Sequence, residues 1–155
     1  MIKVTYHGVS DNLDILPDFI SYYEDRLGSH RLKTRIYGQI TKQEAELPGI
    51  TEEVFSDLQE IEAVLQLLEI NLRRTKRKHF QKYLEGYNKA LSSRDAERYT
   101  EGEEDVINGE LLINEVALLR NKYLSIMKGL ETKGFQLSSI TKLKCAGMED
   151  FSMGE

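Results

Sequence analysis

The feature that most constrains this chain is a run of apolar residues spaced alternately four and three apart. The run consists of Val54, Leu58, Ile61, Leu65, Leu68 and Leu72. Such residues occupy the a and d positions of a heptad and form one stripe along a helix, which a second helix must cover. The apolar pattern resumes with Phe80 and Leu84. A helix from Thr51 to about residue 92 would be about 60 Å long at 1.5 Å per residue, so it needs partner helices.

Turn and capping residues mark the other elements of this helical part. Leu47-Pro48-Gly49 is a break, and Thr51 follows it as an N-cap. A second long helix is predicted over 106–133, with Gly134 as the residue that ends it. Between the two helices, 92–105 is predicted to be an acidic loop with one helical turn near 95–99. A short helix is predicted over 139–145.

The first fifty residues are less regular than the rest. Residues 1–7 and 31–40 alternate loosely between apolar and polar side chains, which predicts two short strands. A helix is predicted to start near Asp14 and to end at Gly28. We therefore divide the chain into an irregular or α+β N-terminal segment (1–50), a helical core (51–146) and a flexible acidic tail (147–155). The predicted fold class is mainly α, with long helices in an oligomeric coiled-coil assembly.

The heptad stripe allows two kinds of packing. It can lie inside an intramolecular bundle of two or three helices, or between subunits. The length of the first helix favours self-association, because residues 106–133 are too few to cover it. The predicted subunit contacts are the six residues of the heptad run together with Leu119, Tyr123 and Met127.

Charge is distributed unevenly along the chain. The net charge is −5, yet residues 73–82 carry no acidic side chain. Cations that replace condensed counterions, together with rings that stack on bases, are the chemistry of single-stranded nucleic-acid binding. The alternative is a solvated helix face with Phe80 and Tyr87 in the core. The candidate nucleic-acid-binding residues are Arg73, Arg74, Lys76, Arg77, Lys78, Lys82 and Tyr83.

Nothing in the sequence predicts catalysis, and we expect no enzyme, no cofactor and no metal. The acidic run 101–105 lacks the alternating ligands and central glycine of a calcium loop, so a solvated loop or a partner contact is the better interpretation. His7, His30 and His79 have no metal-ligand spacing, and His79 is expected to face solvent. The single cysteine, Cys145, excludes an intramolecular disulfide. No apolar run is long enough to span a membrane, and no signal pattern opens the chain, so we expect a cytoplasmic protein.

From Lys82 onward the chain resembles a known family. The segments KYLEGYNKALSSRDAERY and INGELLINEVALLRNKYLSIMKGLETKGFQLSSITKL are similar to the UvsY-type recombination mediators of tailed bacteriophages. The resemblance covers about residues 70–150. It includes a basic-aromatic stretch, an acidic connector, an LRNKYL-like core and a Lys-Gly-Phe sequence at 133–135. Family members carry a short basic motif of Leu-Lys-Ala-Arg type; the corresponding place here reads Lys78-His-Phe-Gln-Lys82, so its letters do not match.

The resemblance implies a role in recombination inside the bacterial host cytoplasm. It implies a homo-oligomer that binds single-stranded DNA and helps to load a RecA-like recombinase onto strands covered by single-strand-binding protein. An oligomer would gather several copies of one basic patch on one strand. The first rival is a helical scaffold or adaptor that binds only proteins. The second rival is a small enzyme that uses the acidic run with a metal.

Overall fold

The computed structural model of the chain describes residues 2–86 and 91–147, and its regular structure there is helical. The mainly α prediction is confirmed. The elements are α1 (Tyr6–Asp11), the 3-10 turn η1 (Leu13–Ile15), α2 (Leu16–Lys33), α3 (Ile40–Glu85), α4 (Ser93–Glu101) and α5 (Glu104–Cys145).

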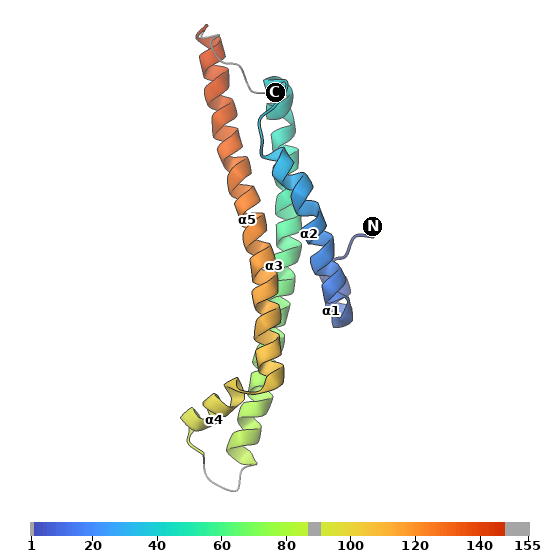
Figure 1. The fold of residues 1–155 in the computed structure, drawn as a ribbon, viewed down its shortest axis with the longest axis vertical. Helices are drawn as coiled ribbons and strands as arrows, with labels where there is room; N and C mark the ends of the chain where they lie inside the picture. The colour runs from blue at the N-terminus through green and yellow to red at the C-terminus, as the bar shows by residue number, and fades with distance from the viewer. Residues whose placement is uncertain (1, 87–90, 148–155) are drawn as a thin grey trace.

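Two long helices form the body of the molecule. α3 has 46 residues and α5 has 42, and they run antiparallel, side by side (Figure 1). α2 lies against this pair along one half of its length, and α4 lies at the other end (Figure 1). We call the first half the three-helix region. We call the second half, residues 72–113 with α4, the hairpin end.

The heptad stripe of α3 lies in the core of the single chain. Val54, Leu58, Ile61, Leu65 and Leu68 are buried, and Leu72 is half-buried. Leu119 and Tyr123 of α5 are buried in the same core, and Met127 packs on it. The buried residues among the predicted subunit contacts therefore lie in the core of one chain, where α2 and α5 cover them. Met127 is half-buried and also lines an apolar groove on the surface. The prediction underestimated the length of the second helix. α5 is longer than 106–133 and covers α3.

The N-terminal segment is helical, so the two predicted strands are wrong. α1 begins at Tyr6, where the backbone N–H of Gly8 donates to Thr5 Oγ1 at 3.4 Å. Residues 31–33 complete α2, and α3 begins at Ile40. Loose alternation over a few residues resembles a strand, but packing against a long helix pair overrides it. The predicted helix end at Gly28 is also wrong, because α2 continues to Lys33.

Pro48 does not start a new helix. α3 begins at Ile40 and passes through Pro48 without ending, and Thr51 Oγ1 donates to the carbonyl of Leu47 at 2.8 Å. A proline inside a helix removes one backbone hydrogen bond, typically at a cost of about 3 kcal/mol. Contacts hold the first turns in place nevertheless, since Ile40 is buried and Thr141 Oγ1 of α5 donates to Glu44 Oε1 at 2.7 Å.

α5 likewise passes through its predicted end. Gly134 lies inside the helix, where an added Cβ would come 3.3 Å from Leu47 Cδ2 of α3. The glycine therefore serves close packing of two helices and does not end one. The predicted short helix over 139–145 is the continuation of α5. The predicted flexible tail lies outside the described residues beyond Gly147.

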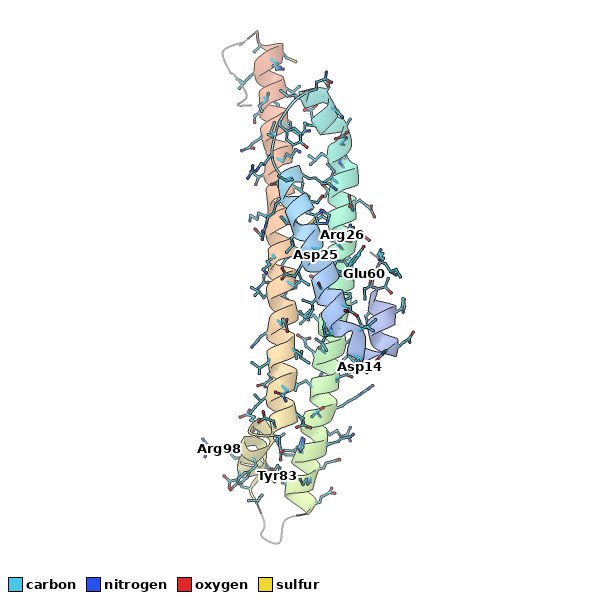
Figure 2. The ribbon with its side chains drawn as sticks, turned by 45° about the vertical axis from the view of Figure 1, so that its right-hand side comes forward. Asp14, Asp25, Arg26, Glu60, Tyr83 and Arg98 are labelled. Atoms are coloured by element: carbon cyan, nitrogen blue, oxygen red, sulfur yellow. The ribbon has the colours of Figure 1, made fainter. Side chains whose placement is uncertain are left out.

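Buried polar groups fasten α2 to the helix pair. Asp57 of α3 accepts hydrogen bonds from Arg26 Nε at 2.7 Å and from His30 Nε2 at 2.9 Å. Figure 2 shows Arg26 on α2 where that helix faces α3. Tyr123 of α5 donates to the carbonyl of Tyr23 at 2.8 Å, and the two rings meet edge to face. Lys133 Nζ donates to the carbonyl of Lys33 at 2.7 Å.

Within the described part of the chain, no helix combines the length and the apolar character that crossing a bilayer requires.

Candidate nucleic-acid interface

The last turns of α3 extend beyond α2 into the hairpin end, and their two sides differ. Leu72, His79 and Tyr83 face α4 and α5 and are half-buried. With 3.6 residues per turn, the cationic side chains of this segment point to the other side of α3, where they are exposed. This surface, which we call the cationic face, consists of Arg73, Arg74, Arg77, Lys78 and Lys82.

The cationic face keeps its charge. Among the residues that the structure describes, none of its five members forms an ion pair. Lys76 is different: its Nζ lies 3.2 Å from Glu110 Oε1 of α5, so an acid of the hairpin end neutralises it. Five of the six predicted cations therefore share one surface, and the sixth belongs to the contact between α3 and α5.

Tyr83 does not lie on the cationic face. Its hydroxyl donates to Glu103, and its ring stacks on Tyr99 of α4 with 5.4 Å between centroids. Figure 2 shows Tyr83 near the end of α3, beside α4. The prediction grouped Tyr83 with the cations because they are neighbours in sequence, but the helix turns it toward α4. Tyr99, which is half-exposed, places an aromatic surface near the cations that the sequence analysis did not single out.

The acidic stretch after residue 92 is more ordered than predicted. Ser93–Glu101 forms the helix α4, and the hydroxyl of Ser92 accepts a hydrogen bond from the N–H of Asp95. Its Ala96 and Thr100 are buried, which fixes α4 against α3. A cavity of about 440 Å³ between the two helices is lined by Phe80 and Arg77 and by two acids of α4, Glu97 and Glu101. Phe80 is half-buried there; Tyr87 lies outside the described residues.

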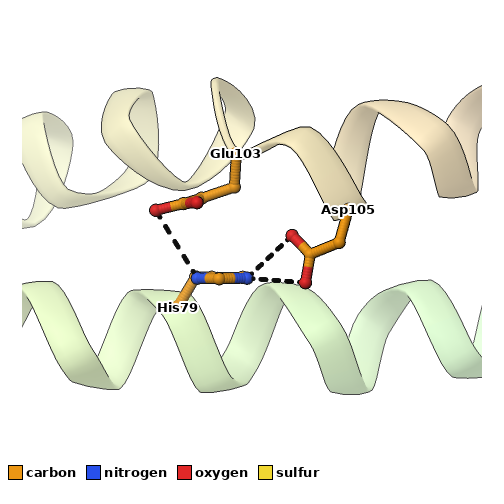
Figure 3. A group of neighbouring side chains, drawn as sticks. All are labelled: His79, Glu103 and Asp105. Atoms are coloured by element: carbon orange, nitrogen blue, oxygen red, sulfur yellow. Dashed lines mark hydrogen bonds and ion pairs between the residues drawn. The ribbon is translucent and has the colours of Figure 1, made fainter.

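His79 lies between two carboxylates and is half-buried. The prediction that it faces solvent is therefore wrong. Its Nε2 lies 2.8 Å from Asp105 Oδ1, and its Nδ1 lies 3.6 Å from Glu103 Oε1 (Figure 3). The hydrogen bond from His79 is the main reason why the pKa of Asp105 is lower than usual. Asp105 also lies in the first turn of α5, where a negative charge complements the helix dipole.

The sequence analysis missed this pairing because His79 is far in the chain from the two acids, 26 residues before Asp105. One signal would have found it. If the chain reverses near residue 92, residues equally far from 92 face each other across an antiparallel hairpin, and 79 and 105 are such a pair. A reversal point one residue later, at 93, likewise pairs Tyr83 with Glu103 and Lys76 with Glu110.

Comparison with known proteins adds no relative. No family model, curated protein or solved structure matches the chain. The interpretation of the cationic face therefore depends on its own geometry and charge.

Proposed function

We propose that this chain binds single-stranded DNA through the cationic face, as a mediator that helps a RecA-like recombinase onto strands covered by single-strand-binding protein. The observation that carries the proposal is a group of exposed cations at the end of α3 that form no ion pair with any residue that the structure describes. In a chain with a net charge of −5, such a group is a local feature that the overall charge does not explain. The resemblance to UvsY-type mediators supplies the DNA and recombinase partners of the proposal.

The form of the face sets the mode of binding. Guanidinium and ammonium groups contact phosphates, which carry no sequence information, so binding is indifferent to sequence. Arg74, Lys78 and Lys82 are spaced four residues apart and lie on successive turns of one helix, so they follow a strand that runs along α3. Each contact releases counterions, so the affinity falls steeply with salt.

Assembly into a homo-oligomer is part of the proposal, because one short face binds weakly and several faces on one strand gain from effective concentration. The heptad stripe is not available for assembly. On the side of the α3–α5 pair away from α2, an apolar groove of about 920 Å³ is lined by Phe55 and Leu47 of α3 and by Leu124 and Met127 of α5. Phe55 is 49% exposed and Leu124 is 43% exposed. We propose that a second copy occupies this groove.

The DNA proposal is tested by fluorescence anisotropy with labelled single strands over a series of salt concentrations. The triple substitution Arg77→Ala, Lys78→Ala and Lys82→Ala should weaken binding. It should also flatten the log–log salt slope by up to about 2, at about 0.7 per phosphate on a single strand. Alanine preserves helix propensity, so fold and mass should not change.

A charge-matched control removes three exposed cations that lie outside both the cationic face and the groove: Arg35→Ala, Lys142→Ala and Lys144→Ala. This control should bind nearly as the parent protein does. If both triple variants bind equally well with equal slopes, the cationic face has no role in DNA binding. The mediator step is then measured as recombinase loading onto strands already covered by single-strand-binding protein, which the parent should accelerate and the first variant should not.

The second candidate function is a protein-interaction scaffold that does not bind nucleic acid. The apolar groove favours it, because large exposed apolar patches mark protein contacts. The same DNA titration separates the two functions. Under the scaffold hypothesis, Phe55→Asp abolishes assembly and the parent protein shows no salt-dependent DNA binding.

A further inference from the structure

The hairpin end brings together three side chains of the kind that bind metals. His79 comes from α3, Glu103 from the connection that precedes α5, and Asp105 from the first turn of α5. One ligand atom from each residue lies within 4.8 Å of the other two. Figure 3 shows the imidazole ring edge-on between the two carboxylates. Separate elements thus bring two carboxylates to one imidazole, with Glu103 at Nδ1 and Asp105 at Nε2.

We propose that His79, Glu103 and Asp105 bind one divalent transition-metal ion of the Zn²⁺ class. Zinc takes imidazole nitrogen at about 2.0–2.1 Å and carboxylate oxygen at about 2.0–2.2 Å. Ligands of a tetrahedral ion are then separated by less than 4.8 Å, so the three donors must move closer together, and at least one carboxylate must turn toward the nitrogen that the other contacts. Imidazole favours zinc, nickel and copper, whereas magnesium and calcium prefer oxygen alone.

The surroundings suit an accessible ion. The side chain of His79 is 19% exposed and that of Asp105 is 59% exposed, so solvent reaches the cluster and water can fill the remaining coordination position. Tyr83 donates to Glu103 and so orients one ligand from outside, as hydrogen-bond donors around metal sites do. Metal ions bind these ligand types in their deprotonated forms, so the affinity falls as the pH decreases.

Bound metal would join α3 to the start of α5 across the end of the hairpin. His79 is 26 residues before Asp105, and it lies on the same part of α3 as the cationic face but on the opposite side of the helix. The ion would therefore hold the segment that carries the cations against α4 and α5. The inference does not depend on DNA binding, since it follows from the donors alone.

The test is titration of the full chain with ZnCl₂, followed by isothermal calorimetry, and with CoCl₂, followed by visible absorption. The background carries Cys145→Ser, because the exposed thiol of Cys145 is an alternative zinc ligand. We expect one ion per chain. His79→Gln and Asp105→Asn should each weaken binding by about 10–100-fold or more, since even outer-shell changes have effects of this size. The control His7→Gln removes an exposed histidine of α1 and should change nothing.

A second measurement separates loss of binding from loss of fold. Circular dichroism should show unchanged helicity in each variant, and zinc should raise the melting temperature of the parent but not of His79→Gln. Binding that is equally tight in His79→Gln, or an absence of saturable binding in the parent, would overturn the proposal. In that case the cluster is a hydrogen-bonded contact between helices and no more.

Discussion

The three-helix region and the hairpin end share the helices α3 and α5, yet they satisfy their polar groups in opposite ways. In the three-helix region, α2 closes over the pair, and Asp57 is only 3% exposed between His30 and Arg26. At the hairpin end, the described residues include no third long helix beside α3 and α5, and Asp105, which pairs with His79, is largely exposed to water. A covered polar pair contributes to stability and specificity, whereas an uncovered one remains accessible to ligands.

This difference assigns separate tasks to the two halves. A buried charge must be paired, because an unpaired one is very unfavourable in an apolar interior. An exposed pair contributes little to stability, typically about 0–1 kcal/mol. The hairpin end can therefore carry exposed cations and the His79–Glu103–Asp105 contact, whose ionic interactions contribute little to stability.

Removing a core ring in the three-helix region should have the largest effect. Tyr123→Ala deletes a fully buried side chain and its hydrogen bond to Tyr23, so we expect a loss of about 3–5 kcal/mol in the free energy of unfolding. Urea denaturation measures this loss. Tyr37→Ala, at a position 55% exposed, is the control and should stay within about 0.5 kcal/mol of the parent. Similar values for the two variants would contradict the description of the core.

Removing the buried charge should come next in size. Asp57→Asn keeps the shape of the side chain but leaves Arg26 and His30 without their carboxylate, and we expect a loss of about 2–3 kcal/mol. The matched control is Asp25→Asn, an exposed position on α2. If Asp57→Asn proves as stable as its control, the buried pair does not fasten α2.

The pH dependence of stability should report the same pair. Burial alone would raise the pKa of Asp57, but the hydrogen bonds from His30 and Arg26 outweigh it and hold the pKa below its usual value. A carboxyl with a lowered folded pKa stabilises the protein at pH values above its ordinary pKa, about 3.9. This stabilisation is lost as the pH falls through the lowered pKa. Thermal melts below about pH 4 should therefore show a smaller decline in Asp57→Asn than in the parent.

The smallest effect should come from the hairpin end. Glu103→Gln removes the carboxylate that Tyr83 and His79 share, yet the site is open to water, so global stability should fall by about 1 kcal/mol or less. Hydrogen exchange should become faster in α4 while the rates in α2 stay the same. A global loss as large as that of Asp57→Asn would remove the distinction between the two halves.

The sequence predicted the helices more reliably than their ends. The stripe Val54–Leu72 identified α3, because heptad spacing is a long and regular signal. Local stop signals were misleading at Pro48, Gly28 and Gly134, where tertiary contacts carry the helix through. The helix propensity of a single residue changes the free energy of a helix by a few kcal/mol at most. Packing along a long partner helix contributes more.

The candidate site was predicted in composition but not in arrangement. The cations of the cationic face were found because charge in a helix is visible from the sequence alone. Tyr83 and His79 were misplaced because their direction depends on which side of α3 meets α4 and α5. Periodicity gives the angle between two side chains on one helix, but it does not give the side that a second helix covers.

The order of the elements along the chain has a consequence for synthesis. The apolar stripe of α3 is covered in large part by α5, which follows α3 in the chain. During synthesis, α3 is therefore complete before any part of α5 leaves the ribosome. The nascent stripe is then a surface that chaperones recognise. Tyr83 and Glu103 are only 20 residues apart, so pairing begins as soon as α4 emerges and extends along α3 with each further turn of α5.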